Sequence, residues 1–148
     1  MVIVTAAADG ENAGCLVGFT TQCSIDPPRF LVFLSEKNRT HEVARRADRL
    51  AVHFLDDADH ALAELFGGET GDNVDKFSRC RWHAVDGAPV LDDAERWFVG
   101  RVVDRYERGD HGGHLLEPIS VAPAPGPRES EGDLSYQDVR EMEPGHEP

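Results

Sequence analysis

The chain has 148 residues, enough for one domain with a hydrophobic core, and its formal net charge of −13 disfavours binding to nucleic acid or to an anionic membrane surface. No apolar run reaches the about 18 residues of a membrane span, and the N-terminus lacks the basic start and apolar middle of a secretory signal, so we expect a cytoplasmic protein. The three cysteines are odd in number and form no C-x-x-C pair, which predicts reduced thiols rather than disulfides or a zinc ribbon.

Short apolar runs bounded by Gly, Pro, Asp or Asn predict β-strands in the first third of the chain. The runs are residues 2–6, 14–19, 30–34 and 50–55. Between the first two, the Asp9-Gly10 pair supplies the positive φ of a tight hairpin, which predicts two antiparallel neighbours. This start favours an antiparallel meander over a βαβ unit.

Two short helices and three further strands are predicted in the rest of the chain. The helices are residues 40–48, capped by Asn38 or Thr40, and residues 58–66, capped by Asp57. The strands are residues 81–85, 95–105 and 114–121. The middle strand has apolar side chains on both faces, so we expect the barrel interior on one face and a helix or a partner chain on the other. The predicted fold class is mainly β, antiparallel, with short helices.

The composition changes at Pro123. Residues 123–148 hold five of the nine prolines, and seven acidic residues outnumber two basic ones. Such a segment buries too little apolar surface to offset its ordering entropy. We therefore predict a folded domain over residues 1–122 and an acidic, proline-rich arm over residues 123–148 that is flexible or lies on a partner chain.

The first candidate site is the stretch from residue 17 to residue 24. A strand is expected to pass here into a loop of hydroxyl, amide and thiol side chains, which Asp26-Pro27-Pro28 then stops. A loop of this kind offers N–H and O–H donors to a polar ligand. The alternative is an ordinary polar connection without a ligand.

The second candidate site is the stretch from Ser35 to Thr40, between a strand and a helix. Lys37 and Arg39 are cations in an acidic protein, and the free amides at a helix start favour an anion. These features suit a phosphate group. The alternative is a capped helix whose Lys and Arg side chains lie in solvent.

The third candidate site is the stretch of residues 109–114, where glycines flank Asp110 and His111. The turn would present the His111 imidazole in a cleft, with its tautomer set by a neighbouring carboxylate. Zinc or iron binding by Asp110, His111 and His114 is the rival, but three ligands from one loop are unusual, so we predict no metal. A purely structural turn is the other alternative.

Taken in this order, the three stretches resemble the flavin reductase-like family of FMN-binding split β-barrels. The matching motifs lie at residues 24–28, 30–34, 37–40, 75–77, 87–91 and 109–111, and the similarity covers residues 2–121. The sequence departs from the family pattern at Gln22 and Cys23, in the polar stretch, and at Arg29, after the two prolines.

The resemblance implies an NAD(P)H:flavin oxidoreductase that passes hydride to FMN, with FAD as the other flavin, and that supplies a monooxygenase. It also implies an obligate homodimer with the flavin in a groove at the interface. The flavin ring and ribityl chain would contact Val17, Gly18, Phe19, Thr20, Thr21, Gln22, Cys23 and Ser24. The phosphate would contact Ser35, Lys37, Asn38, Arg39 and Thr40.

His111 would lie where the nicotinamide stacks, and would orient it or supply a proton. Hydride transfer between two cofactors needs stacked rings rather than an acid–base pair or a nucleophile. All of this requires the segments around Gln22 and Asn38 to converge on one groove. Two alternatives remain: a flavin carrier or sensor without turnover, and a split barrel for another flat cofactor such as haem or a deazaflavin.

Overall fold

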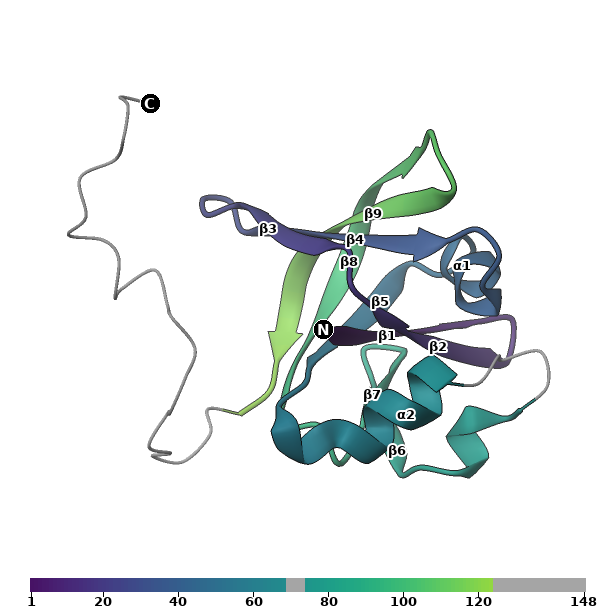
Figure 1. Cartoon of the computed structure of the whole chain (residues 1–148). Helices are drawn as coiled ribbons and strands as arrows, with labels where there is room; N and C mark the ends of the chain where they lie inside the picture. Colours follow the sequence, from purple (N-terminus) through teal and green to yellow (C-terminus); the bar gives the residue numbers. More distant parts are fainter. Residues whose placement is uncertain (69–73, 124–148) are drawn as a thin grey trace.

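A computed structural model describes residues 1–68 and 74–123 and shows one curled antiparallel sheet of seven strands (Figure 1). Their order is β2-β1-β5-β8-β9-β4-β3, and a separate two-stranded hairpin, β6–β7, packs against them. The sheet strands are β1 (Val2–Ala8), β2 (Glu11–Val17), β3 (Thr20–Ser24), β4 (Arg29–Ser35), β5 (Arg49–Phe54), β8 (Arg96–Glu107) and β9 (His111–Val121). The other elements are α1 (Arg39–Ala44), η1 (Asp57–Asp59), α2 (His60–Gly68), η2 (Lys76–Ser78), β6 (Trp82–Val85) and β7 (Ala88–Leu91). The predicted acidic arm lies outside the described residues, except for Pro123.

The first hairpin forms as the sequence predicts. Asp9 and Gly10 adopt φ values of 53° and 78°, and Ala8 pairs with Glu11 across the two-residue turn. Two successive positive φ values match the right-handed twist of the flanking strands. The prediction of antiparallel neighbours is therefore confirmed.

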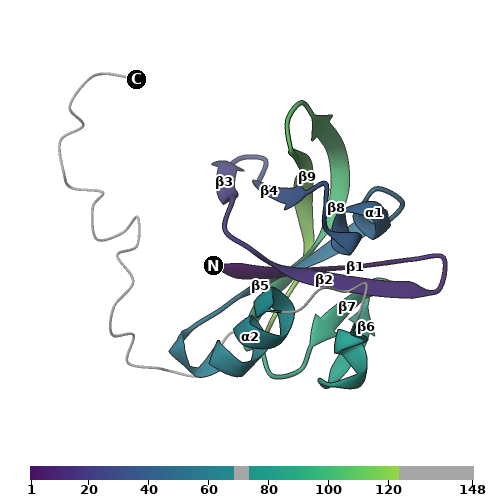
Figure 2. The same ribbon diagram turned by 45° about the vertical axis from the view of Figure 1, so that its right-hand side comes forward.

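Two hydrophobic clusters lie on opposite faces of the β1–β2 hairpin. The interior cluster includes Val4, Leu34 and Val52, and Val43 of α1 packs into it. The second cluster joins Ile3 of β1 to Phe66 of α2, Phe77 of η2 and Leu91 of β7. Figures 1 and 2 accordingly show α1 on one side of this hairpin and α2 with β6–β7 on the other.

Strand β8 is buried on both faces in its first half. Phe98 points into the interior cluster, while Val99 packs against Ala88 and Val90 of β7. The β6–β7 hairpin therefore covers the outer face, rather than the helix or partner chain expected from the sequence. The helices among the described residues are all too short or too polar to cross a bilayer.

Several predicted boundaries were wrong. Residues 20–24 form strand β3, not a loop, because they pair with β4 from Thr20 opposite Val32 to Ser24 opposite Arg29. Strand β9 begins at residue 111 rather than 114, since residues 111–114 continue the ladder with β4. Strand β7 was not predicted as a strand.

Helix α1 ends at Ala44, four residues before the predicted end. The amides of Arg46 and Ala47 donate to the carbonyls of Val43 and Ala44, three residues back, so the last turn tightens before the chain enters β5. Helix α2 likewise starts later than predicted, after the turn η1, and Asp56 rather than Asp57 provides the cap.

Candidate functional site

The turn between β4 and α1 is fixed by one side chain. Asn38 has extended backbone angles, and its Oδ1 accepts a hydrogen bond of 3.0 Å from the Thr40 amide. This is the usual geometry of a helix N-cap, and it selects Asn38 over Thr40 as the cap. The cap holds the stretch from Ser35 to Thr40 in one conformation at the end of β4.

The turn that carries His111 lies beside it. Strands β4 and β9 are neighbours, and Ser35 is the register partner of His111. The Glu36 amide also donates to the Asp110 carbonyl at 3.0 Å. Two stretches about 75 residues apart in the chain are therefore held side by side by main-chain hydrogen bonds.

His111 is oriented by two neighbours. Its Nδ1 lies 2.7 Å from Asp110 Oδ1, and its ring centroid lies 5.0 Å from that of Phe19. The hydrogen bond from His111 lowers the pKa of Asp110, so Asp110 is a carboxylate and Nδ1 carries the donated proton. Nε2 is then the ring nitrogen that can face a ligand.

These elements enclose a hollow of about 160 Å³ that we call the central hollow. Its walls come from β2, the β2–β3 connection, β4 with the following turn, and β9. The lining residues are Cys15, Leu16, Val17, Gly18, Phe19, Phe33, Ser35, Asn38 and His111. Six of them belong to the predicted site: Val17, Gly18, Phe19, Ser35, Asn38 and His111. The structure thus brings one part of each predicted stretch to a common place.

Three lining residues were missed from the sequence. Phe33 sits between Val32 and Leu34, which are buried in the interior, so strand alternation places it on the opposite face. That alternation was the available signal. Cys15 and Leu16 belong to a strand whose apolar sequence predicts a place in the hydrophobic core. Burial raises the pKa of the Cys15 thiol. Nothing in their local sequence distinguishes them as site residues.

The remaining residues of the first predicted stretch do not line the central hollow. Thr20, Thr21, Gln22, Cys23 and Ser24 form β3, which extends with β4 as an arm away from the body of the sheet (Figures 1 and 2). The Gln22 side chain donates to the Ser24 carbonyl, and the Cys23 side chain is exposed. The expected convergence with Asn38 therefore occurs at residues 17–19 and not at Gln22.

Arg39 faces a different depression. Its Nε and Nη2 donate to the two carboxylate oxygens of Glu11 at 2.6 and 2.8 Å, and Nη1 donates to Glu42. These bonds from Arg39 lower the pKa of Glu11. The bidentate pair fastens α1 to the β1–β2 hairpin, so the Arg39 side chain already has anionic partners.

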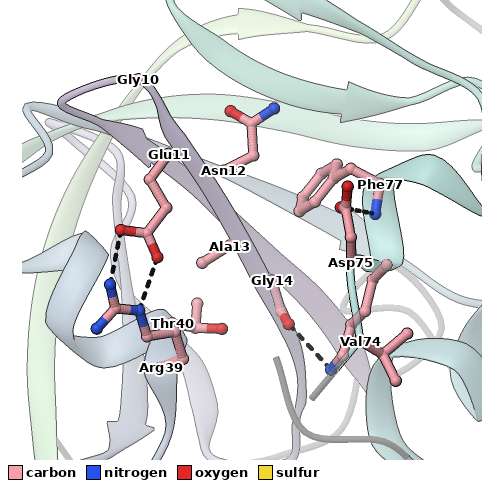
Figure 3. A pocket seen from close by; sticks show the side chains of 11 residues that line it. Gly10, Glu11, Asn12, Ala13, Gly14, Arg39, Thr40, Val74, Asp75 and Phe77 are labelled. Carbon is pink, nitrogen blue, oxygen red and sulfur yellow. Dashed lines mark hydrogen bonds and ion pairs between the residues drawn. The ribbon is translucent and has the colours of Figure 1, made fainter. Parts of the chain in front are cut away.

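The depression beside this ion pair has a volume of about 490 Å³, and we call it the hairpin pocket (Figure 3). It is lined by Gly10, Glu11, Asn12, Ala13, Gly14, Arg39, Thr40, Val74, Asp75, Lys76 and Phe77. Figure 3 shows Arg39 and Thr40 on one side of strand β2 and Asp75 and Phe77 on the other. Thr40, also predicted for the phosphate, therefore belongs to this pocket rather than to the central hollow.

Lys37 is the cation that remains available at the turn. Its side chain is exposed, and no carboxylate lies within ion-pair distance of it among residues 1–68 and 74–123. Its charge acts on Asp110, whose pKa is lowered first by the hydrogen bond from His111 and further by the charge of Lys37. The Lys37 amide donates to Ser35 Oγ at 3.4 Å.

The Asp75-Lys76-Phe77 motif has a structural role. Lys76 is buried, and its Nζ donates to the carbonyls of Gly14 and Phe66 at 3.3 and 3.0 Å. Asp75 caps η2 by accepting from the Phe77 amide. The motif ties η2 to β2 and α2, on the far side of the hairpin pocket from Arg39.

A buried imidazole connects α1 to the His111 turn. His41 is 4% exposed and packs directly on Gly112, where a Cβ atom would lie 2.2 Å from His41 Cε1. The His41 ring also meets the ring of His114 edge-on, with centroids 5.9 Å apart. Only a residue without a side chain fits at position 112. Among the described residues, no group of three or more metal-ligating side chains is arranged to hold a metal ion.

An open antiparallel barrel with its hollow between β2, β4 and β9 defines the chain as a split-barrel protein. Comparison with known proteins then gives the family: the family model described as "Flavin reductase like domain" matches residues 1–141. The chain belongs to the flavin reductase-like domain family, which confirms the resemblance found in the sequence.

Two curated relatives illustrate the similarity. A probable flavin reductase of Rhizobium meliloti is 32% identical over 113 residues, which cover 73% of this chain and 35% of that protein. The reductase component of 4-nitrophenol 4-monooxygenase/4-nitrocatechol 2-monooxygenase of Rhodococcus opacus is 31% identical over 121 residues, covering 82% of this chain and 64% of that protein. The chain therefore spans between about a third and two thirds of the length of these relatives.

Two solved structures have the same fold. The FMN-binding protein of Thermus thermophilus superposes with a TM-score of 0.75 at 25% identity, covering 81% of this chain and 67% of that one. The NADH:FAD oxidoreductase of Streptomyces globisporus superposes with a TM-score of 0.74 at 25% identity, covering 82% and 72%. The predicted split β-barrel is therefore confirmed.

Proposed function

We propose that the protein is an NAD(P)H:flavin oxidoreductase that binds FMN, or FAD, at the central hollow. The observation that carries the proposal is the meeting of Val17, Gly18 and Phe19 with Asn38 and His111 in one hollow. Hydride moves between the nicotinamide and the flavin themselves, so the protein's part is to bind and align the two rings. The names of the relatives point to the same chemistry.

We assign a different part to each end of the hollow. Gly18 leaves the β2–β3 connection without a side chain, and Phe19 supplies an aromatic wall against which a flat ring can stack. At the other end, Ser35 and Asn38 provide polar groups, and Lys37 provides a positive charge for the phosphate.

Arg39 and Thr40 line the hairpin pocket and not the central hollow. Because Glu11 and Glu42 occupy the Arg39 guanidinium, we assign the direct charge contact to Lys37. Arg39 then acts mainly by fixing α1 against the β1–β2 hairpin. His111, with Nδ1 bound to Asp110, would present Nε2 to the nicotinamide or to the reduced flavin.

The size of the central hollow supports a homodimer. Ligand pockets commonly have volumes of about 300–1,000 Å³, and the hollow of about 160 Å³ encloses only part of a flavin nucleotide. Phe19 is 62% exposed beside it, and Ile25 at the tip of the arm is 81% exposed. We infer that a second copy of the chain covers Ile25 of the arm and completes the groove beside Phe19. Sedimentation should show a dimer; a monomer that binds flavin fully would contradict this inference.

The reduced flavin would serve a monooxygenase; the Rhodococcus relative is named as the reductase component of such an enzyme. We place the reaction in the cytoplasm, because the three cysteines are free thiols, as expected in a reducing compartment. Gene neighbourhood would identify the oxygenase that receives the flavin.

Anaerobic reduction tests the function directly. The purified full chain is mixed with FMN or FAD and with NADH or NADPH, and the visible flavin band and the nicotinamide absorbance are followed together. Bleaching of the flavin band with matching loss of reduced nicotinamide is expected. Tight flavin binding without nicotinamide oxidation would instead support a carrier or sensor, and a haem or deazaflavin spectrum in the purified protein would point to another flat cofactor.

A further inference from the structure

A second hollow adjoins the central hollow on the side of the β8–β9 hairpin, and we call it the aromatic pocket. Its volume is about 380 Å³. The lining residues are Phe19, Phe33, Tyr106, Arg108, Gly109, Asp110 and His111. Phe19, Phe33 and His111 line both hollows, so a molecule in the aromatic pocket would touch whatever occupies the central hollow.

Three aromatic rings form the walls of the aromatic pocket. Phe19 is 62% exposed and Tyr106 is 55% exposed, and they line one pocket; exposed apolar surface that is contiguous commonly marks a binding site. Phe33 and Tyr106 reach the pocket across Gly113, where a Cβ atom would lie 2.9 Å from Phe33 Cε1 and 3.3 Å from Tyr106 Cβ. Exposed ring faces of this kind bind flat, aromatic ligands by stacking.

Arg108 supplies a positive charge at the rim of the aromatic pocket. Its guanidinium lies 5.6 Å from the centre of the Tyr106 ring, and no carboxylate pairs with it in the part of the chain that the structure describes. Six other arginines do pair with carboxylates: Arg29, Arg39, Arg45, Arg46, Arg81 and Arg101. With 28 acidic against 15 basic residues, an arginine left without a carboxylate is available to bind an anion.

The pocket therefore suits a molecule that is both flat and anionic and that reaches His111. A nicotinamide nucleotide has these properties, since it carries a planar ring and, one ribose away, a phosphate. The planar fork of a guanidinium matches phosphate oxygens through two parallel hydrogen bonds.

We propose that Arg108 binds the phosphate on the nicotinamide ribose of the hydride donor, while the aromatic pocket holds the nicotinamide half of that donor. This assignment rests on the proposed reductase function and adds to it the residue that recognises the donor. NADH and NADPH share this phosphate, so Arg108 contributes equally to the binding of both. The flavin site does not depend on it.

The test compares two donors that differ only in the phosphate: reduced nicotinamide mononucleotide and reduced nicotinamide riboside. Hydrogen bonds to charged groups contribute about 1.5–3 kcal/mol, and at an exposed rim we use the lower end, which corresponds to about a 10-fold change. Arg108→Ala should lower kcat/KM about 10-fold for the mononucleotide, NADH and NADPH, through KM. It should leave the riboside within about 2-fold.

Arg49→Ala is the matched control. Arg49 is exposed on β5, has no carboxylate partner within the described ranges 1–68 and 74–123, and its loss changes the net charge by the same amount. It should leave the kinetics with all four donors unchanged. Arg108→Lys, which keeps the charge but loses the planar fork, should fall between the wild type and Arg108→Ala.

Flavin affinity is measured on every variant, and Arg108→Ala should retain the wild-type value. Equal kinetics for Arg108→Ala and Arg49→Ala would refute the assignment while the reductase function stands. An equal loss with the riboside would show that Arg108 shapes the pocket rather than binding phosphate, and would also refute it. Failure of the wild type to oxidise any donor would remove the proposed function itself.

Discussion

His53 makes the stability of the fold dependent on pH in a direction that the structure specifies. The imidazole is fully buried, its Nδ1 donates to the Ile3 carbonyl at 3.1 Å, and its Nε2 accepts from the Leu91 amide at 3.0 Å. A proton on Nε2 would point at the N–H of Leu91, so the ring must be neutral in the folded protein. Burial accordingly lowers the pKa of His53 from 6.5 to about 4.

The magnitude follows from proton linkage. Below pH 6.5 the unfolded chain binds a proton at His53, whereas His53 stays neutral in the folded chain until the pH approaches 4. The free energy of unfolding therefore falls as the pH falls. The full stability is present above pH 6.5, about 2 kcal/mol is lost by pH 5, and the loss reaches about 3 kcal/mol near pH 4. His114, also buried with its pKa lowered to about 4, adds a loss in the same pH window.

Urea unfolding between pH 8 and pH 4.5, at one fixed protein concentration, measures this dependence. His53→Gln, which cannot titrate, should be less stable than the wild type at pH 8 because the imidazole contacts to Ile3 and Leu91 are disturbed. As the pH falls, the free energy of unfolding of the variant should decrease less than that of the wild type, and the difference should equal the loss attributed to His53. Parallel pH profiles for the two proteins would contradict the reasoning. An NMR titration of the wild type that showed His53 protonating near pH 6.5 would contradict it without relying on the variant.

Four other substitutions test the site and the contacts that support it. Lys37→Ala should weaken FMN binding by about 1 kcal/mol and leave riboflavin binding unaffected, as measured by flavin fluorescence; equal losses for FMN and riboflavin would argue against a phosphate contact. Arg39→Ala should mainly lower the free energy of unfolding in urea, because it breaks the ion pair with Glu11. His111→Phe, assayed at saturating flavin, should slow nicotinamide oxidation by about 10-fold or more, measured in single turnovers; an unchanged rate would remove His111 from the reaction. Gly112→Ala should cost about 1–3 kcal/mol because its Cβ overlaps the buried imidazole of helix α1; an unchanged thermal midpoint would contradict the packing.

Local sequence rules predicted the features that depend on local chemistry. Asp9 and Gly10 determined the first hairpin, and Asn38 determined where α1 begins. The order of short motifs identified the family. The same rules misread residues 20–24, because polar side chains suggested a loop, while the pairing of Thr20 with Val32 of β4 produces a strand.

Non-local contacts explain the rest. Arg39 and Glu11 are 28 positions apart, so no local pattern could show that the predicted phosphate ligand is held by a carboxylate. Thr5 of β1 donates to the carbonyl of Pro89, 84 positions away, and so helps to seat β7 on the outer face of the sheet. Pro89 argues against a strand at this place in the sequence, and it is the tertiary environment that lets β7 pair with β6.

The contact between His41 and Gly112 has an evolutionary consequence. The two positions share one volume, so neither can change size alone without a clash or a cavity. Homologues that carry a side chain at the position of Gly112 should carry a smaller residue at that of His41, and the double substitution His41→Ala with Gly112→Ala should recover stability that Gly112→Ala loses. Covariation at this pair would therefore indicate that the start of β9 and helix α1 evolved together to keep this contact.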